Sequence, residues 1–345
     1  MSETVRIGFA GVGNMGQAAH LRNYVAVPGC EVVAIAELRP KLREAVARRY
    51  GIANTYPDAA AMLNAEKLDA IVASQPFTHH GSIVPPLYAA GVPVFTEKPL
   101  AGSVAVAEQI LSTLASSKSW HMVGYHKRSD PATMYAKAEI DRLRATGELG
   151  PLKYVRLVMP EGDWTANGFR EVCIRTDDPS PNVPADAGVN ADPAYISFVN
   201  YYIHQINLLR HLFGEPYTVT YADPTGVLLA AQSNSGVPGV IEMSPFKTSI
   251  DWQESAFVAF ERGWIRIELP APLTSNRPGR VEVYRDPGHG ETPTLTSPTL
   301  PWNHAMYQQA VNFVSAVRGE IPPMCTAQEA LLDLQNARQY CDLVR

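Results

Sequence analysis

A glycine-rich turn near the N-terminus constrains the fold more than any other feature of the sequence. Its residues, which form the pattern Gly-x-Gly-x-x-Gly, are Gly11, Val12, Gly13, Asn14, Met15 and Gly16. The turn follows the apolar run Val5–Ala10 and precedes a segment with helical spacing. The first glycine permits a tight turn, the second lets the backbone approach a pyrophosphate, and the third allows close packing of helix on strand. The N-terminus of the following helix has free backbone N–H groups and a positive partial charge, both of which favour binding of phosphate. We therefore predict a dinucleotide-binding strand–turn–helix unit.

The rest of the N-terminal third alternates apolar runs with helical patterns. The predicted strands are Val5–Ala10, Glu31–Ala36, Ala70–Ser74 and Val92–Thr96, and the clearest helices are Pro40–Tyr50 and Val104–Ala115. This alternation predicts right-handed βαβ units and a parallel sheet. We therefore expect residues 1–125 to form a doubly wound Rossmann domain, which belongs to the α/β class.

After residue 125 the pattern changes to hairpins. Asp130 and Pro131 predict the start of a helix that runs to about Gly147. The strand candidates that follow are Leu152–Met159, Thr218–Ala222, Val227–Gln232, Gly239–Met243, Ala256–Phe260 and Trp264–Leu269. Their spacing predicts an antiparallel or mixed sheet in an α+β domain over residues 126–345, closed by helices near Asn303 and after a capping box at Thr326. The proline-rich stretches 177–193 and 270–301 are predicted to be long loops.

Composition excludes several classes of function. The chain has 345 residues, enough for two domains, and its net charge of 29 − 34 = −5 offers no basic surface for nucleic acid. No apolar run of 18 residues is present, so no membrane span is predicted. The N-terminus lacks the pattern of a secretory signal, and four scattered cysteines suggest neither a disulfide framework nor a zinc site. We expect a cytoplasmic protein without a metal.

Glu37 and Arg39 bear on the choice of dinucleotide. Glu37 ends the second predicted strand 21 residues after Gly16, where a carboxylate can accept hydrogen bonds from the adenosine ribose. A carboxylate would repel the 2′-phosphate of NADP, so NAD is favoured. Arg39 could bind that phosphate, which keeps NADP as the second choice, or it could be a solvated residue at a helix start.

Glu97-Lys98-Pro99, at the end of the fourth strand, adds a second motif. Together with the glycine-rich turn and a later helix that ends HQINLLRHLFGEP, it resembles the Gfo/Idh/MocA family of oxidoreductases. The resemblance implies a Rossmann domain followed by an open-faced mixed β-sheet domain. It also implies NAD(P)-dependent oxidation or reduction of a secondary alcohol or ketone on sugars, inositols and related polyols.

The resemblance assigns roles to several residues. It places Lys98 between nicotinamide and substrate, and it makes His204 the acid/base partner. Glu97 would hold the backbone near the nicotinamide, or it could have only a capping role. Ser74 and His80 would line the dinucleotide site, although His80 could instead cap a helix.

The segment around His204 departs from the family pattern D-x-x-x-H-x-x-D, because Asn200 and Asn207 replace both carboxylates. With a separation of four residues, Asn200 and His204 should share one helix face and reach one substrate. The irregular stretch 161–192 contains Trp164 and Arg170, which suit a sugar site, or else it is an arm between subunits. No spacing of ligands predicts a metal site.

These features predict an NAD-dependent dehydrogenase for a sugar, polyol or glycoside. Two alternatives remain open: a dinucleotide-binding sensor without enzyme activity, and a glycoside hydrolase that uses NAD for transient oxidation. We also expect a homodimer or homotetramer, because the C-terminal sheet should leave one apolar face, with Trp252, Phe257 and Trp264, without helices to cover it.

Overall fold

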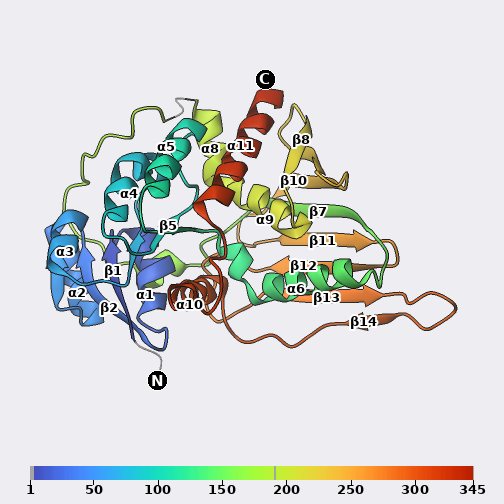
Figure 1. Cartoon of the computed structure of the whole chain (residues 1–345), viewed down its shortest axis with the longest axis horizontal. Coiled ribbons are helices and arrows are strands. Elements are labelled where there is room, and N and C mark those ends of the chain that lie inside the picture. The colour runs from blue at the N-terminus through green and yellow to red at the C-terminus, as the bar shows by residue number, and fades with distance from the viewer. Residues whose placement is uncertain (1–3, 190–191, 345) are drawn as a thin grey trace. The chain divides into compact units, whose positions relative to one another are not determined.

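The computed structural model describes residues 4–189 and 192–344 (Figure 1). The chain divides into two compact units. The first unit comprises Met1–Tyr125, Asn167–Ile196 and Met306–Leu334, and the second comprises His126–Ala166, Ser197–Ala305 and Gln335–Arg345. The predicted boundary after residue 125 coincides with the first boundary between the units. Two segments expected in the second domain, however, cluster with the first unit.

The first unit contains the predicted parallel sheet. Its strands are β1 (Val5–Ala10), β2 (Cys30–Ala36), β3 (Asn54–Tyr56), β4 (Ala70–Ala73), β5 (Val94–Glu97) and β6 (His121–Gly124). The helical segments between them are η1 (Gly16–Leu21), α1 (Arg22–Tyr24), α2 (Pro40–Tyr50), α3 (Ala59–Ala65), η2 (Phe77–His79), α4 (His80–Tyr88) and α5 (Val104–Ala115). The strand order β3-β2-β1-β4-β5-β6 is doubly wound, with the change of direction beside β1. The predicted Rossmann fold is therefore confirmed, and its ligand-binding edge lies where the strands end.

Aromatic packing explains why residues 306–334 return to the first unit. Phe313, on α10 (Ala305–Val317), lies 5.4 Å from Phe95, 5.7 Å from Trp120 and 6.2 Å from Tyr24, measured between ring centroids. All four rings therefore belong to one core. Short-range sequence patterns predict the helix but not the partner that buries its apolar face, so the simple division at residue 125 was incomplete.

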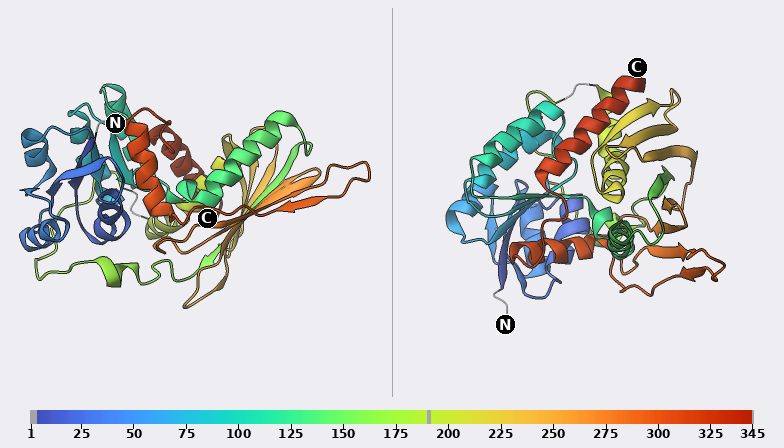
Figure 2. Two further views of the ribbon diagram at one scale, coloured as in Figure 1. Left: turned by 90° about the horizontal axis from the view of Figure 1, so that it is seen from below. Right: turned by 45° about the vertical axis from the view of Figure 1, so that its right-hand side comes forward.

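The second unit is built on a mixed sheet. Its strands are β7 (Leu152–Glu161), β8 (Tyr217–Ala222), β9 (Leu228–Ser233), β10 (Pro238–Lys247), β11 (Glu254–Phe260), β12 (Gly263–Leu269), β13 (Arg280–Arg285) and β14 (Thr294–Thr296). The order is β14-β13-β12-β11-β7-β10-β9-β8, in which β7 and β10 pair parallel and the other neighbours pair antiparallel. The remaining helical segments of the chain are η3 (His126–Ser129), α6 (Pro131–Thr146), α7 (Gly168–Val172), α8 (Pro193–Tyr201), α9 (Ile203–Phe213) and α11 (Ala327–Val344). Figure 2 shows α6 lying along the sheet, where it packs on β12 and β13.

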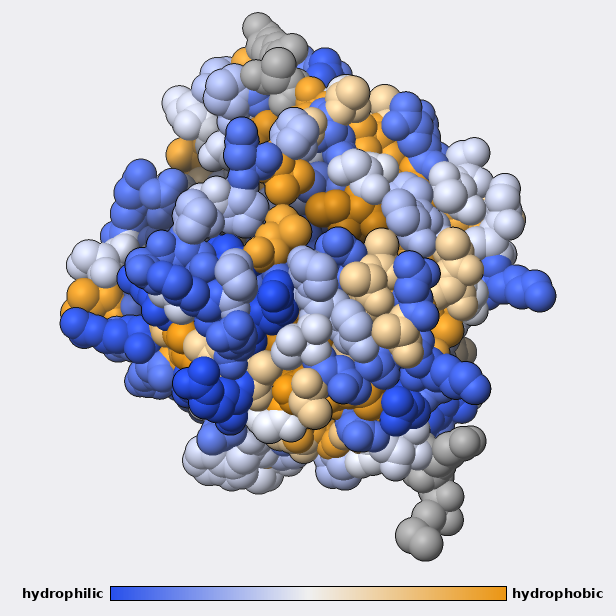
Figure 3. Space-filling view, turned by 90° about the vertical axis from the view of Figure 1, so that its left-hand side faces the viewer, coloured by the Kyte–Doolittle hydropathy of each residue, from blue (hydrophilic) through white to orange (hydrophobic). Residues whose placement is uncertain are grey.

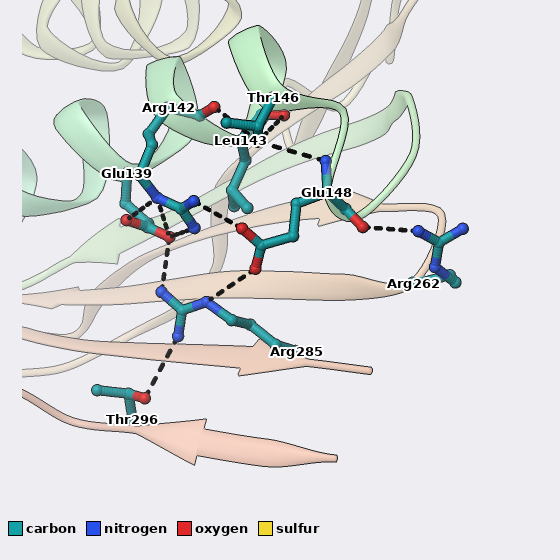
Figure 4. Close-up of polar contacts among 8 residues, drawn as sticks. All are labelled: Glu139, Arg142, Leu143, Thr146, Glu148, Arg262, Arg285 and Thr296. Atoms are coloured by element: carbon teal, nitrogen blue, oxygen red, sulfur yellow. Dashed lines mark hydrogen bonds and ion pairs between the residues drawn. The ribbon is translucent and has the colours of Figure 1, made fainter. Parts of the chain in front are cut away.

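The prediction of a single long loop over 270–301 was wrong, because β13 and β14 lie within it. The prolines of this stretch stand outside both strands, so neither strand loses a backbone donor. Charged side chains also tie β13 to α6 (Figure 4). Glu139 accepts from Arg285 at 2.6 Å and from Arg142 at 2.7 Å, and Arg142 also reaches Glu148 at 2.6 Å. Hydrogen bonding to Arg142 and Arg285 outweighs burial and holds the pKa of Glu139 below its usual value.

Helix ends follow their sequence signals. Asp130 accepts from Ala132 N–H at the start of α6, and Gly147 ends that helix with a positive φ of 66°. At the start of α11, Thr326 and Glu329 form the predicted capping box, in which each side chain accepts from the other residue's backbone N–H. Among the described residues, no helix is long and apolar enough to cross a membrane. Hydrophilic side chains cover most of the face in Figure 3, with hydrophobic ones in small groups between them.

Candidate active site

The glycine-rich turn has the geometry that its sequence predicts. Gly11 has φ +89°, and a Cβ there would lie 3.0 Å from Ser74 O. A Cβ on Gly16 would lie 2.5 Å from Gly11 O, so the first helix packs against the turn itself. Gly13 has more space, because a Cβ there would meet only the Arg39 guanidinium, at 3.5 Å, among the described atoms. This free space beside Gly13 is where the phosphates of a dinucleotide can approach the backbone. Asn14 is exposed and Met15 is half-buried beside it.

Glu37, which the sequence assigns to the adenosine end of the site, is buried. Its Oε2 accepts from Val12 N–H at 3.0 Å, and its Oε1 accepts from Arg39 Nε at 2.8 Å and Arg39 N–H at 3.1 Å. Burial opposes ionisation of Glu37, but these hydrogen bonds and the Arg39 charge outweigh it and lower the pKa of the carboxyl. The pair joins a carboxylate suited to ribose with the guanidinium that could bind a 2′-phosphate.

Ser74 and Gln75 face the turn from the end of β4. Ser74 Oγ and Gln75 Oε1 are buried and have no hydrogen-bond partner within the part of the chain that the structure describes. A Cβ on Gly11 would lie 3.0 Å from Gln75 Nε2, which places this side chain against the turn. Buried polar atoms without partners cost free energy unless a ligand or water satisfies them. These atoms therefore fit a dinucleotide bound over the turn.

His80 links two loops at this edge of the sheet. Its ring is fully buried, with Nδ1 3.0 Å from Leu100 O and Nε2 3.2 Å from Gln75 O. Burial lowers the pKa of His80, although both carbonyls oppose that shift. The ring joins the end of β4 to the segment that follows Lys98, so it holds the loops that carry Gln75 and Lys98.

Glu97 ends β5 and fixes the start of the Lys98 segment. Its Oε1 lies 2.6 Å from His20 Nε2, and its Oε2 accepts from Lys98 N–H at 3.1 Å. Burial opposes ionisation, but the His20 contact and the nearby Lys98 charge lower the pKa of Glu97. Glu97 thus holds the backbone of Lys98 against η1, while the Lys98 side chain is only half-buried. Sequence reasoning missed His20, because 77 residues separate it from Glu97.

His204 belongs to the second unit, near the start of α9. The single helix predicted through Asn200 and His204 is divided at Tyr202, which separates α8 from α9. Tyr202 O accepts from both Gln205 N–H and Ile206 N–H, so the first turn of α9 is tight. Asn200 is exposed at the end of α8, whereas His204 is half-buried and its ring lies edge-on to His126, 4.7 Å away.

A buried carboxylate, Glu254, organises the residues beside these two histidines. It accepts from Lys127 Nζ, from Gln205 Nε2 at 2.8 Å and from Trp252 Nε1 at 3.1 Å. Lys127 follows His126 in the chain and Gln205 follows His204, so one carboxylate holds both segments. Burial lowers the pKa of Lys127, while Glu254 opposes this shift. No local signal marks Glu254, which lies 127 residues from Lys127.

A small pocket opens beside this cluster in the second unit. Its polar lining consists of His126, Lys127, Asp130, Glu254, Thr274, Arg277 and His304. Burial raises the pKa of Asp130 to about 6, although the N–H groups of Ala132 and Gly279 oppose the shift. The lining offers both donors and acceptors, but the enclosed space is only about that of one water molecule.

The two residues proposed for sugar binding in the stretch 161–192 lie in different units. Trp164 is half-buried in the second unit, where its carbonyl accepts from Leu273 N–H at 3.2 Å. Arg170 is exposed on α7, in the part of the stretch that belongs to the first unit. Residues 190–191 of this stretch lie outside the described residues. Within the described chain, no group of three or more histidine, cysteine or acidic side chains is placed to hold a metal ion.

Known proteins support the assignment of the first unit. Residues 5–125 match an oxidoreductase family with an NAD-binding Rossmann fold. This part of the chain belongs to the Gfo/Idh/MocA family of oxidoreductases. Residues 5–125 therefore form the NAD-binding domain of that family.

Relatives of this family extend the likeness beyond the first unit. Inositol 2-dehydrogenase of Acidothermus cellulolyticus is 33% identical over 138 residues, which cover 40% of either chain. The scyllo-inositol 2-dehydrogenase (NAD(+)) of Bacillus subtilis is 25% identical over 71% of this chain and 68% of its own. A levoglucosan dehydrogenase solved with NADH and L-sorbose shares the fold, with a TM-score of 0.74 and 17% identity over 99% of this chain and 97% of that one.

Proposed function

We propose that the chain is an NAD-dependent dehydrogenase that oxidises a secondary alcohol of a cyclic polyol or sugar, or reduces the corresponding ketone. The observation that carries the proposal is Lys98, which follows β5 at the ligand-binding edge of the sheet and is held there by Glu97 and His20. The names of the inositol-oxidising relatives support the substrate class.

Each proposed residue has a separate task in the reaction. Residues Gly11–Gly16 would hold NAD, which would supply the hydride acceptor when bound. Lys98 stabilises the negative charge that develops on the alcohol oxygen, and His204 takes the hydroxyl proton. Glu254 keeps the segments of His126 and His204 in place through Lys127 and Gln205.

A substrate panel tests this proposal against its alternatives. The protein is mixed with NAD and with inositols, aldoses, alditols and glycosides in turn, and NADH absorbance is followed. We expect NADH to form with a polyol or sugar. Dinucleotide binding without turnover of any compound would favour the sensor. Cleavage of a glycoside without net NADH would favour the hydrolase.

The Glu37–Arg39 pair leads to a prediction about cofactor choice. Glu37→Gln should weaken NAD binding roughly ten- to a hundredfold, because a charged acceptor of ribose hydroxyls contributes about 1.5–3 kcal/mol. The same change should improve NADP binding, since Arg39 no longer faces an ionised partner. Calorimetric titration with both dinucleotides measures this. As a matched control, Arg39→Gln should weaken NADP binding and should not strengthen NAD binding. Tighter binding of NADP than of NAD by the unmodified protein would contradict the prediction.

We also propose a homo-oligomer formed through the face of the second sheet opposite α6 and α9. Phe257, Trp264 and Tyr284 form an aromatic row on this face, with ring centroids 5.8 and 5.7 Å apart, and all three are half-buried. We expect light scattering to give a multiple of 37.7 kDa, as for a dimer or tetramer. Trp264→Glu should lower that mass, whereas Trp302→Glu should not, because Trp302 lies between β14 and α10 and not on this face of the sheet. A mass of 37.7 kDa for the unmodified protein would contradict this proposal.

A cytoplasmic location remains a prediction. The four cysteines, Cys30, Cys173, Cys325 and Cys341, are all unbridged, which accords with a reducing compartment. Fractionation of cells that produce the protein would test it, with activity expected in the cytoplasmic fraction.

A further inference from the structure

Residues 172–189, here called the strap, run in an extended course along the first unit (Figures 1 and 2). The strap is first attached beside the glycine-rich turn. Gln17 Oε1 accepts from Ile174 N–H at 2.8 Å, and Gln17 Nε2 donates to Ile174 O at 3.2 Å. Cys173 Sγ lies 3.5 Å from Asn14 O within the turn itself. The strap therefore begins at the phosphate-binding end of the dinucleotide site.

A second attachment lies at the start of α2, just after the Glu37–Arg39 pair. Asp178 accepts from Leu42 N–H at 2.8 Å and from Lys41 N–H at 3.3 Å. Thr176 donates to the same carboxylate at 2.7 Å. These backbone donors are groups that a helix leaves unpaired in its first turn, so Asp178 caps α2 from a distant part of the sequence.

The third attachment repeats this arrangement at the start of α4. Asp186 accepts from Gly81 N–H at 2.6 Å and from Ser82 N–H at 2.9 Å, while its own N–H donates to Thr78 O at 2.8 Å. Val183 O lies 3.0 Å from His79 Nε2. The strap therefore ends beside the segment that follows Gln75, on the far side of the turn from α2.

The sheet order shows what lies between these attachments. In the order β2-β1-β4, α2 follows β2 and α4 follows β4, so Asp178 and Asp186 stand on opposite sides of the end of β1. The exposed residues 179–182, Pro-Ser-Pro-Asn, cross from one side to the other. Two prolines in four residues restrict the backbone of this crossing. The edge that it crosses carries Glu37 on one side and Ser74 and Gln75 on the other.

We propose that the strap closes over the adenosine half of the bound dinucleotide and controls its release, with Asp178 and Asp186 as the positioning residues. This inference rests on the proposed function only in placing NAD at this edge. The strap must detach from at least one of the two helix starts before the adenosine can leave. Dinucleotide exchange is therefore slower than an open edge would allow.

Release of NADH tests the proposal without any polyol substrate. The double variant Asp178→Ala/Asp186→Ala should release NADH at least ten times faster than the unmodified protein, measured by stopped-flow fluorescence after mixing with excess NAD. Asp141→Ala is the matched control and should leave the rate unchanged, because its exposed carboxylate pairs with Lys137 on α6, outside the strap. Equal release rates in the double variant and the unmodified protein would overturn the proposal.

Loss of two helix caps could also disturb the fold, so a second variant and a second measurement separate the two effects. Pro179→Gly/Pro181→Gly loosens the crossing without removing a cap and should also speed release, with a melting temperature lowered only slightly by the added freedom of the unfolded chain. Hydrogen exchange at residues 176–186 should slow when NAD is bound. If NAD binds but the rate of hydrogen exchange in the strap is the same with and without it, the strap lies outside the site. Absence of NAD binding would instead contradict the proposed function.

Discussion

Lys98→Ala should lower kcat roughly 10²- to 10³-fold, which is the scale for loss of one group that stabilises developing negative charge. NAD binding should be nearly unchanged, because the substitution keeps the Lys98 backbone N–H that Glu97 accepts. The effect is large because the ammonium acts where the alcohol oxygen gains charge. Steady-state kinetics with the best polyol of the panel, together with NAD calorimetry, measure both quantities.

A charge-preserving variant separates two tasks of this lysine. Lys98→Arg keeps the positive charge but cannot give up a proton near neutral pH. Substantial activity in Lys98→Arg would show an electrostatic task, whereas a loss equal to that of Lys98→Ala would show proton transfer. Lys153→Ala is the surface control, because Lys153 is exposed on β7. Unchanged kcat in Lys98→Ala would remove this residue from the reaction.

Local patterns predicted the elements that carry the cofactor site. Strand β1, helix α2 and helix α5 have the predicted bounds, because an apolar run or a helical spacing marks each of them within a short window. The glycine-rich turn could also be placed from sequence, since the positive φ of Gly11 and the close approach at Gly16 demand glycine. These features are determined by residues that are close together in the sequence, so a short sequence window is enough to predict them.

Contacts between distant segments could not be predicted in this way. The His20–Glu97 pair holds the backbone of Lys98, but no local sequence pattern around either residue predicts that the two will be in contact. Asp178 and Asp186 lie in a proline-rich stretch that reads as a loop, but they complete helices more than 100 residues earlier. Capping groups are normally sought beside the helix that they cap, so a cap supplied by a distant segment leaves no signature at either place.

The division of the helix at Tyr202 shows a different limit. The run from Asn200 to His204 has helical spacing, and Tyr202 itself keeps near-helical dihedral angles, φ −83° and ψ −4°. At this break, Tyr202 Oη lies 2.6 Å from Ser244 Oγ on β10, a tertiary contact that the local sequence does not reveal. Sequence reasoning therefore placed His204 on the correct segment. It did not anticipate that His126, rather than a residue one turn away, would lie against its ring.

His204→Ala should lower kcat for alcohol oxidation roughly 10²-fold or more, the usual scale for loss of a general base. Oxidation requires an unprotonated base, so kcat/KM should fall towards acid pH in the unmodified protein and lose that dependence in the variant. Added imidazole should restore part of the activity of His204→Ala, because it can enter the space left by the ring. The measurement is kcat/KM against pH, with and without imidazole, at saturating NAD.

Two further variants decide whether the base is His204 or its neighbour. His126→Phe keeps an aromatic ring against His204 but removes both ring nitrogens, so it should retain most of the activity and the acid limb. His289→Ala, at an exposed histidine, controls for loss of an imidazole elsewhere. If the acid limb disappears in His126→Phe and persists in His204→Ala, His126 is the base. If the limb persists in both, proton transfer falls to Lys98, and Glu254 then serves to shape the pocket rather than to position a catalytic histidine.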